Sequence, residues 1–401
     1  MRSIRLIAFI SRLEEIDDFV SRAPEVEFVF ATFCDLADAA VRIDPSDDTP
    51  MFETFGAYHA SRPFCGVVNR KEKYVAPAAA LALKLGLPPI LTAPQVARDK
   101  YQMRLRLNGD AIFPRTILVR DAADLAPVPS DMFPCVLKPR FGFNSRSVCL
   151  AKDSDELRSF YADQHARYHQ LNKQDGTNSD FVVEELIRGT EHTIESLVRD
   201  GEPLLHIISD KHPMTPPYFI EVGDIAPSCL EESDQQLCRQ AADDAITRLG
   251  IRNGWTHTEV KLDSRGPIVI ECAARMGGGY FEQLIEEVYG IDRLRVLIDL
   301  FLGRDLPCRA EPRSQVAARR FVVYGGPRRM ELLNPEEVLS APGIRLIWPE
   351  TADRIGRTIA GPPDDFNNTL FEYFAYGETA AQARFRAAEV LRRARISQSP
   401  L

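Results

Sequence analysis

The sequence predicts an α/β protein of two or three domains, and three observations support this class. Short β-rich segments alternate with segments of helical length in the first part of the chain, a pattern typical of a parallel sheet flanked by helices. From residue 134 onward the pattern changes to pairs of strands with helices between them. The chain has 401 residues, 45% of them hydrophobic, which is enough for more than one core.

The first domain, residues 1–97, is predicted to be a small parallel α/β unit. Its strands are expected at Ile4–Ile10, Val26–Phe30 and Phe64–Val68 because these runs are short and β-rich. A helix is expected at Lys71–Leu85, between polar residues and a glycine. The domain lacks the Gly-x-Gly-x-x-Gly motif of dinucleotide-binding domains.

The central part, residues 98–306, is predicted to be an α+β domain with several strand pairs. The expected strands are Cys135–Lys138, Ser147–Ala151, Phe181–Ile187, His192–Val198, Leu204–Ser209, Trp255–Leu262 and Ile268–Ala273. The expected helices are Asp153–His169, Asp234–Leu249, Tyr280–Val288 and Asp292–Leu302. The last two strands are expected to form a hairpin around Asp263–Gly266, and polar Asn172–Asp180 is expected to be a loop.

The last part, residues 307–401, is predicted to be a separate and partly β domain. Its composition shifts to short runs broken by Gly and Pro, for example Arg320–Tyr324. A closing helix is expected at Ala380–Arg393.

Charge and cysteine content exclude several classes of protein. Lys and Arg number 49 against 58 Asp and Glu, a net charge of -9, so nucleic acid is not an expected partner. The apolar runs are too short for a membrane span or a signal peptide. The eight cysteines have no Cys-x-x-Cys spacing, which favours buried thiols in the cytoplasm over disulfides or zinc.

Several residues of the central part suit nucleotide phosphates. Lys100 opens a helical stretch and Lys138 ends a strand, so both cations can project from fixed elements toward one cleft. The loop Gly142–Ser147 adds backbone amides and hydroxyls. Each piece alone is also compatible with an ordinary turn or a surface lysine. The order and spacing of all the pieces favour a nucleotide site.

Two glutamates are candidates for a metal site. Glu259 and Glu271 lie on the two strands of the predicted hairpin, where carboxylates at short range would repel each other. A hard cation resolves that repulsion, and Mg²⁺ suits carboxylates together with phosphate oxygens. The alternative is that one of the two carboxylates points to solvent.

These motifs resemble those of the ATP-grasp ligases, and within them the group that joins amino acids to one another or to related carboxylates. The resemblance runs from about Phe64 to Gly279. It implies an ATP-grasp fold whose core has two subdomains, about residues 98–183 and 184–306, between the N-terminal α/β domain and the C-terminal domain. It also implies ATP and Mg²⁺ as cofactors, with one or two ions and with Mn²⁺ as an alternative metal.

The resemblance further assigns roles to individual residues. Phosphate-binding residues are expected to be Lys100, Lys138 and Ser145. Adenine is expected to pair with backbone groups of Glu185 and Ile187 and with the Glu184 carboxylate, and the ribose with Glu191. Glu259 and Glu271 are the expected metal ligands and act in catalysis together with Arg275. Ala273 replaces the asparagine of the commonest family pattern, which leaves the binding of a second ion open.

The segment Pro217–Ser228 resembles the family segment that lies over the acceptor site. Glu221 is therefore a candidate partner for a substrate ammonium group. Asp224 stands where relatives often have histidine, an exchange expected to favour a more basic or amine-bearing substrate. Arg275, Gly278 and Gly279 are further candidates for substrate contacts, since consecutive glycines allow a close approach to the backbone.

The sequence thus predicts an ATP-dependent carboxylate–amine ligase that forms an amide, dipeptide-like bond through an acyl phosphate and releases ADP and phosphate. A purine-pathway or carbamoyl-type ATP-grasp enzyme and a catalytically silent nucleotide-binding module remain as alternatives. The expected partners are ATP and an amino acid or carboxylate substrate. Neither a nucleic acid nor a membrane is expected, and a homodimer is compatible with the sequence.

Overall fold

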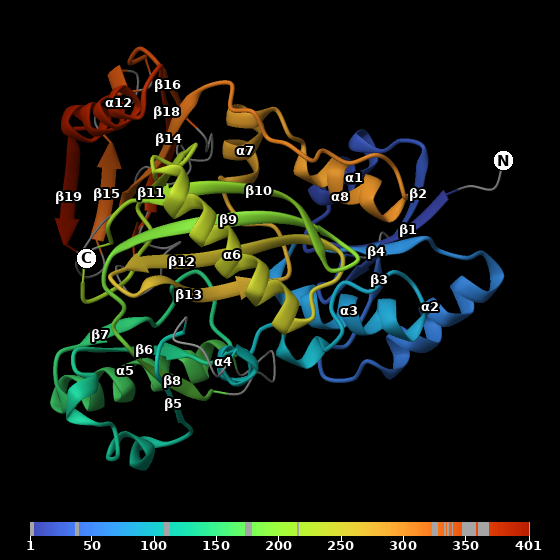
Figure 1. The fold of residues 1–401 in the computed structure, drawn as a ribbon, viewed down its shortest axis with the longest axis horizontal. Coiled ribbons are helices and arrows are strands. Elements are labelled where there is room, and N and C mark those ends of the chain that lie inside the picture. Colours follow the sequence, from blue (N-terminus) through green and yellow to red (C-terminus); the bar gives the residue numbers. More distant parts are fainter. Residues whose placement is uncertain are drawn as a thin grey trace.

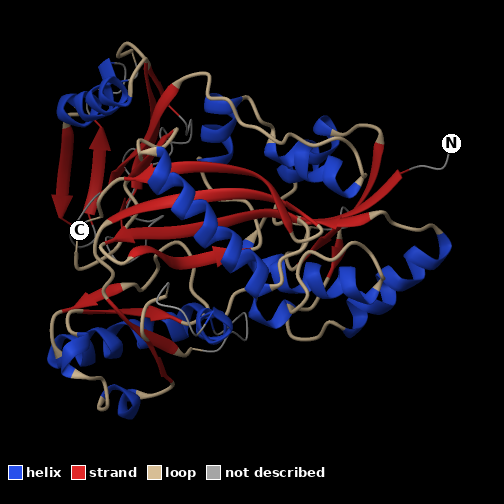
Figure 2. Ribbon diagram, in the orientation of Figure 1, coloured by secondary structure: helices blue, strands red, loops and turns tan. Residues whose placement is uncertain are grey.

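The computed structural model describes residues 4–36, 40–107, 113–172, 179–214, 216–322, 328–332, 334, 337–338, 340–346, 358–359 and 369–400. Within these residues the chain forms four sheets, with one large sheet between the two termini of the chain (Figure 1). Figure 2 shows strands through the centre, one long helix lying across them and further helices around them.

The N-terminal domain is the predicted parallel α/β unit. Its sheet has the order β3-β2-β1-β4, and all its pairs are parallel. The strands are β1 (Ile4–Phe9), β2 (Val26–Thr32), β3 (Val41–Arg42) and β4 (Gly66–Val68). The helices are α1 (Glu14–Arg22), α2 (Thr49–Ser61) and α3 (Val75–Lys84). The expected helix at Lys71–Leu85 is therefore present, although Glu72–Tyr74 form a 3₁₀ turn before α3.

A small antiparallel sheet follows, with the order β5-β8-β6-β7. Its strands are β5 (Thr116–Val119), β6 (Cys135–Pro139), β7 (Cys149–Ala151) and β8 (Phe181–Glu185). Helix α4 (Lys100–Leu107) leads into this unit, and α5 (Ser154–Asn172) packs on it. The buried side chains of the sheet and of α5 form a separate core cluster. Most of the expected loop Asn172–Asp180 lies outside the described residues.

The large sheet has eight antiparallel strands in the order β13-β12-β9-β10-β11-β14-β18-β16. Its first five members are β9 (Thr190–Arg199), β10 (Glu202–Lys211), β11 (Gly223–Ala226), β12 (Gly254–Asp263) and β13 (Gly266–Ala273). Helix α6 (Glu232–Leu249) packs across β12 and β13, and α7 (Phe281–Tyr289) and α8 (Arg293–Phe301) follow the hairpin. The predicted β12–β13 hairpin and its turn are present.

The C-terminal strands extend this same sheet. They are β14 (Gln315–Val322), β16 (Ile344–Leu346) and β18 (Thr369–Gly377). Because β14 pairs with β11, strands on both sides of the boundary predicted at residue 307 belong to one continuous sheet, and the division into domains at that residue stays a prediction. A further sheet of β15 (Arg328–Leu332), β17 (Thr358–Ile359) and β19 (Ile396–Pro400) and helix α12 (Ala380–Arg393) complete this part. The expected run Arg320–Tyr324 falls partly outside the described residues.

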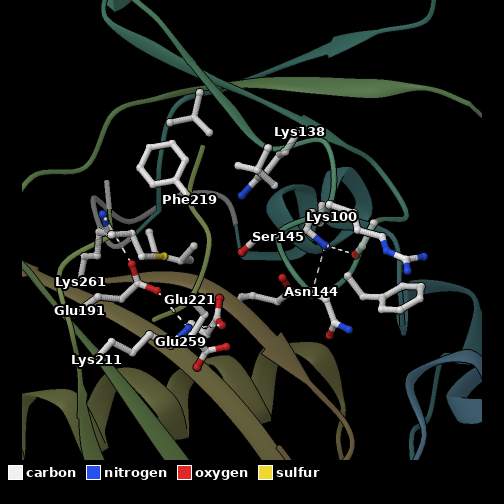
Figure 3. A pocket seen from close by; sticks show the side chains of 18 of the residues that line it. Lys100, Lys138, Asn144, Ser145, Glu191, Lys211, Phe219, Glu221, Glu259 and Lys261 are labelled. Carbon is white, nitrogen blue, oxygen red and sulfur yellow. Dashed lines mark hydrogen bonds and ion pairs between the residues drawn. The ribbon is translucent and has the colours of Figure 1, made fainter. Parts of the chain in front are cut away.

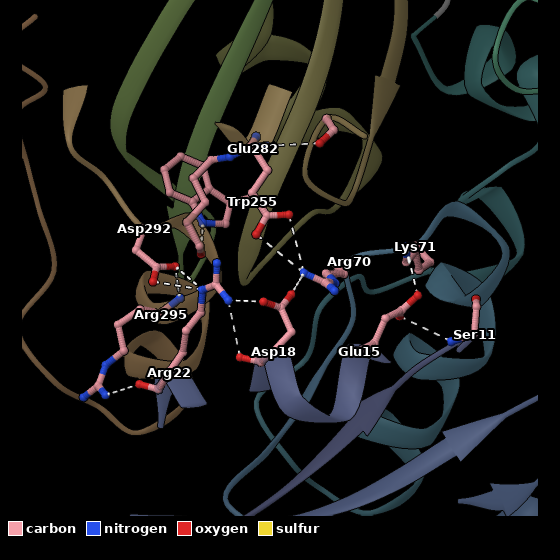
Figure 4. A network of polar contacts seen from close by, with 12 residues as sticks. Ser11, Glu15, Asp18, Arg22, Arg70, Lys71, Trp255, Glu282, Asp292 and Arg295 are labelled. Carbon is pink, nitrogen blue, oxygen red and sulfur yellow. Dashed lines mark hydrogen bonds and ion pairs between the residues drawn. The ribbon is translucent and has the colours of Figure 1, made fainter. Parts of the chain in front are cut away.

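Ion pairs join the N-terminal domain to the helices that follow the hairpin (Figure 4). Arg70 lies 2.6 Å from Asp18 on α1 and 3.4 Å from Glu282 on α7. Arg22 lies 3.0 Å from Asp292, which caps α8. A single hydrophobic core cluster also runs through this domain, the strands β9 to β13 and the helices α6 to α8. These contacts give the central sheet a rigid support on one side.

Among the described helices, none combines the length and the apolar character that crossing a membrane requires.

Candidate nucleotide and amine site

One cavity lies between the small sheet and the large sheet, and nearly all the predicted site residues line it. Figure 3 shows Lys100 and Lys138, the predicted phosphate-binding lysines, on one side of the cavity and Glu191, Glu221 and Glu259 on the other. The predicted residues that line the cavity are Lys100, Lys138, Ser145, Glu184, Glu185, Ile187, Glu191, Glu221, Glu259, Glu271, Arg275, Gly278 and Gly279. Asp224 is the exception, since it is fully buried beneath the cavity wall.

Lys138 is held in the cavity by a buried carboxylate. It ends β6, and its Nζ lies 2.5 Å from Glu184 Oε2 on the neighbouring strand β8. Burial, Arg104 and Lys100 keep the pKa of Lys138 below its ordinary value despite this carboxylate. An anion bound in the cavity would stabilise the charged form of Lys138.

Glu184, the predicted acceptor for the adenine amine, already has several polar partners in this structure. Its two oxygens accept hydrogen bonds from Arg104 Nε at 2.9 Å and from the Thr116 hydroxyl at 3.3 Å, in addition to the Lys138 pair. Its side chain is only 3% exposed. A carboxylate has about four acceptor positions, and Arg104 Nη2 takes another at 3.4 Å. In this structure Glu184 holds Lys138 and Arg104 in place, and its contact with adenine stays a prediction.

The backbone after β8, with Glu185 and Ile187, is the other predicted edge for the adenine. The Glu185 N–H already donates to the Arg115 carbonyl at 3.0 Å, so it is not available to a base. The Ile187 carbonyl accepts from Lys261 Nζ at 3.4 Å. Glu185 and Ile187 both line the cavity, and the apolar side chains of Val136, Val148 and Ile270 line it beside them.

The loop after Lys138 has a conformation that suits anion binding. Asn144, Ser145 and Ser147 have positive φ angles of 53°, 50° and 58°. Residues in this region of backbone space turn successive amides toward one side. Lys100 Nζ donates to the Gly142 carbonyl at 2.6 Å and so fixes the start of the loop.

The candidate metal ligands face each other, as predicted, but each has its own lysine. Glu259 and Glu271 are paired residues of β12 and β13. Glu259 lies 2.6 Å from Lys211, and Glu271 lies 3.2 Å from Lys100. The repulsion expected between the carboxylates is therefore offset by ammonium groups, and it does not by itself require a metal.

The donor set nevertheless fits a magnesium ion that is completed by phosphate oxygens. The side chains of Glu259 and Glu271 are 22% and 21% exposed, toward the cavity. Within the described part of the chain no group of three or more His, Cys, Asp or Glu side chains is arranged to hold a metal. Mg²⁺ is commonly bound through one or two carboxylates, waters and substrate phosphates, so a pair of glutamates is sufficient.

Lys211 forms ion pairs with Glu191, the candidate ribose-binding residue, and with Glu259, a candidate metal ligand. It was not among the site residues predicted from the sequence. Its Nζ lies 2.6 Å from Glu259 and 3.1 Å from Glu191. Burial lowers the pKa of Lys211, but the four surrounding carboxyl groups outweigh burial and raise that pKa well above its ordinary value. For Glu259 the effects have the opposite signs: burial alone would raise its pKa, but Lys211 and His257 hold this pKa well below the ordinary value. The sequence signal that could have identified Lys211 is the polar ending Ser-Asp-Lys of an otherwise apolar strand.

A buried charge cluster supports the glycine segment beside the metal candidates. Glu195 forms ion pairs with His257 and Arg293 and accepts from the Gly277 N–H at 3.1 Å. Arg293 also donates to the Gly277 carbonyl at 3.1 Å. Burial lowers the pKa of His257, but Glu195 outweighs this and raises it. The cluster fixes the backbone that enters Gly278 and Gly279.

Arg275 lines the cavity, and a residue of the N-terminal domain fixes its orientation. Its Nε donates to Glu72 Oε2 at 2.6 Å, and its Nη1 donates to the Met276 carbonyl at 2.9 Å. The guanidinium therefore cannot rotate freely, which suits a group that positions an anion.

Glu221 and Arg320 line the candidate amine-binding part of the cavity, and the buried Tyr280 contacts both of them from behind. The Tyr280 hydroxyl donates to Glu221 Oε1 at 3.0 Å and also lies within bonding distance of Asp224. Arg320, from β14, stacks over the Tyr280 ring at 5.0 Å. Sequence interpretation missed Tyr280 and Arg320, because only the pairing of β14 with β11 brings Arg320 to the cavity.

The segment that carries Glu221 links the two sheets that enclose the cavity. Tyr218 forms a bridge to Cys149 of β7, and the Pro217 carbonyl accepts from the Leu150 N–H at 2.8 Å. Farther along, β11 is paired with β10 and β14 of the large sheet. Phe219 and Glu221, between these anchors, line the cavity.

Comparison with known proteins points to one family. Residues 131–283 match the family described as an ATP-grasp domain. Carnosine synthase 1 from Gallus gallus is 31% identical over 194 residues, which are 46% of this chain and 20% of that protein. Alanine–anticapsin ligase from Bacillus subtilis strain 168 is 30% identical over 260 residues, 60% of this chain and 54% of that protein. The match thus spans about half, or less, of the length of these relatives.

A solved structure shares the fold over the whole chain. The L-amino acid ligase from Bacillus licheniformis superimposes with a TM-score of 0.76 and 22% identity, and the match covers 100% of both chains. At this identity the likeness concerns the fold, and it confirms the predicted ATP-grasp architecture.

Proposed function

Residues 131–283 match an ATP-grasp domain, and from this match we propose that the chain is an ATP-grasp ligase that uses ATP to join the carboxylate of one amino acid or related acid to the amine of another. One observation carries the proposal: a single cavity has Lys100 and Lys138, suited to ATP phosphates, on one side and Glu221, beside the candidate metal ligand Glu259, on the other. The names of the relatives, which include an L-amino acid ligase and an alanine–anticapsin ligase, support it.

The nucleotide end would bind and orient the phosphates. Lys100 and Lys138 supply positive charge, and the loop around Ser145 supplies amide and hydroxyl donors. Glu259 and Glu271 would hold Mg²⁺, which neutralises phosphate charge when bound. Backbone around Glu185 and Ile187 would border the adenine. Glu191 would accept from the ribose hydroxyls after leaving its present partner, Lys211.

The bond-forming steps need positioning rather than a protein nucleophile. A substrate carboxylate attacks the γ-phosphorus of ATP, which gives an acyl phosphate and ADP, and an amine then attacks the acyl carbon and displaces phosphate. Phosphoryl transfer of this kind depends mainly on orientation and on charge stabilisation. Arg275, held by Glu72, is placed to orient the substrate carboxylate or the transferred phosphoryl group.

Two other functions use the same nucleotide end. A purine-pathway or carbamoyl-type enzyme would have no use for an anionic group such as Glu221 aimed at an ammonium. A catalytically silent module would bind ATP without turnover. Glu221, ionised and facing the cavity, favours the ligase over both.

The proposal is tested by incubating the protein with ATP, Mg²⁺ and amino acids supplied singly and in pairs. We expect ADP and phosphate release that requires an amine-bearing substrate, with a product whose mass equals the two substrates less one water. Glu271→Gln serves as the inactive control. ADP release without any amine, or ATP binding without release under every pair, would overturn the ligase assignment.

A further inference from the structure

The amine end of the cavity contains a second carboxyl group that the proposed reaction does not use. Asp224 lies on β11 and is 0% exposed, whereas Glu221 lines the cavity. The Tyr280 hydroxyl is 3.0 Å from Glu221 Oε1 and forms a hydrogen bond to Asp224 Oδ2. Two carboxyl groups therefore share one hydroxyl.

The chemistry of Tyr280, Glu221 and Asp224 limits the number of protons that these three groups share. A phenol has a single proton, so Tyr280 can donate to only one of the two carboxyl groups at a time. Asp224 Oδ1 has no hydrogen-bond partner among the described residues. Two buried carboxylates in such proximity do not both stay ionised, because burial and like charge both oppose it. One of the carboxyl groups must then carry a second proton.

The surrounding charges decide which group carries it. The ionisable groups that face the pair from every packed element are Glu221, Tyr280, Lys211 of β10, Arg320 of β14 and Glu259 of β12. Burial raises the pKa of Glu221, but Lys211 and Arg320 outweigh it and lower that pKa to about 2. Burial and then the Glu221 charge raise the pKa of Asp224 well above its ordinary value.

We propose that Asp224 is a neutral carboxylic acid that, together with Tyr280, holds Glu221 as the single anionic group of the amine subsite. Asp224 is then a positioning residue, with no contact to substrate. The subsite takes one ammonium group, such as the α-ammonium of an amino acid with an uncharged side chain, and a second cation finds no partner there. The proposal differs from the expectation that Asp224 changes the charge of the pocket and favours a more basic or amine-bearing substrate. The identity of the ligand rests on the proposed function.

The protonation of Asp224 can be measured without substrate on the full-length protein. In protein labelled with ¹³C at the aspartate γ-carbon, the resonance lost in Asp224→Asn belongs to Asp224. If asparagine at this position disturbs folding, the resonance that moves in Tyr280→Phe identifies it instead. We expect the chemical shift of a protonated acid at about pH 7, where an ordinary aspartate is ionised. The shift of a carboxylate at that pH would overturn the proposal.

Kinetics with the amino-acid pair that releases most phosphate give a second, independent readout. Asparagine keeps the shape and the donor of a neutral acid, so Asp224→Asn should raise the KM of the amine-bearing substrate much less than Glu221→Gln does. Glu221→Gln should raise that KM by roughly ten-fold or more, with the KM for ATP unchanged in both variants. Equal losses in Asp224→Asn and Glu221→Gln would show an ionised Asp224 and refute the proposal.

The two experiments separate this inference from the proposed function. If no amino acid supports ADP release, the ligase assignment fails, and the ¹³C measurement alone decides whether Asp224 is neutral. If ligation is found and the resonance is that of a carboxylate, only the inference fails.

Discussion

Glu259 and Glu271 stand directly opposite each other on β12 and β13, and each carboxylate faces a lysine from a different element. Lys211 comes from β10, and Lys100 from the start of α4. A divalent cation between the glutamates would repel both ammonium groups. Metal binding and the release of these lysines toward phosphate oxygens are therefore expected to occur together, which couples the metal site to the nucleotide site.

Glu271→Gln should abolish turnover and leave the fold intact. The change removes one metal-ligand charge from the surface of a hairpin whose backbone pairing it does not touch. Phosphate release measures the first effect, and thermal unfolding followed by circular dichroism measures the second. Glu286→Gln, the same exchange at an exposed position of α7, is the matched control. Turnover within threefold of wild type in Glu271→Gln would rule out an essential ligand.

Lys138→Ala should weaken ATP binding and have little effect on folding. A hydrogen bond to a charged group contributes about 1.5 to 3 kcal/mol, which corresponds to roughly 10- to 150-fold in affinity. Glu184 keeps Arg104 as its partner in this variant, so the small sheet should stay folded. Calorimetry with Mg²⁺ and a non-hydrolysable ATP analogue measures the loss. Lys152→Ala, an exposed lysine of the same region, should bind like wild type, and unchanged affinity in Lys138→Ala would remove the phosphate assignment.

His212→Gln should reduce the sensitivity of the fold to acid. Burial and the nearby Arg319 and Arg384 lower the pKa of His212 to about 3, and its Nε2 has no assigned hydrogen bond in the described structure. The folded pKa is below the unfolded value of about 6.5. The neutral ring therefore stabilises the fold fully above that value, and this contribution is lost as the pH falls toward the folded pKa.

The difference can be read from urea unfolding at two pH values. Between about pH 8 and pH 5, wild type should lose about 2 kcal/mol more unfolding free energy than His212→Gln, the amount expected from a charge penalty over 1.5 pH units. The comparison of slopes, rather than of absolute stabilities, removes any packing cost of the new side chain. Equal losses in both proteins would mean that His212 becomes protonated as easily folded as unfolded.

Local patterns predicted much of the fold and of the site. The hairpin at Asp263–Gly266 and the helix Ala380–Arg393 have the bounds that alternation and composition indicated. Helix α2 was missed because it buries only Met51 and Phe55 and has no regular apolar face. The ATP-grasp fold itself followed from motif order.

Long-range contacts account for what the sequence could not show. Arg320 reaches the cavity only because β14 pairs with β11. Lys211 becomes part of the site because it forms ion pairs with Glu191 and Glu259 on other strands. The Tyr280 hydroxyl that forms a hydrogen bond to Asp224 comes from a residue 56 positions away along the chain. The sequence motif shows which ionisable side chain stands at a position. The charge of that side chain depends on the residues that folding brings next to it.

Adjacent glycines in the segment after Arg275 should respond differently to the same substitution. A Cβ at Gly277 would lie 2.6 Å from Glu195 Oε1 and 2.7 Å from His257 Nδ1, whereas a Cβ at Gly278 has no atom within 4 Å. Gly277→Ala therefore has to push apart a buried ion-pair cluster, which should cost about 1 to 3 kcal/mol of unfolding free energy and lower turnover. Gly278→Ala places its methyl group at the cavity and should leave stability near wild type.

The pair of variants distinguishes support of the fold from shaping of the cavity. Urea unfolding should separate Gly277→Ala from wild type, while Gly278→Ala should differ from wild type only in its KM for the larger substrates. Because both changes add one methyl group to neighbouring residues, differences in helix or strand preference largely cancel. If Gly278→Ala proved as unstable as Gly277→Ala, the Glu195, His257 and Arg293 cluster would not be the reason for the glycine at position 277, and general backbone strain along the segment would explain both losses.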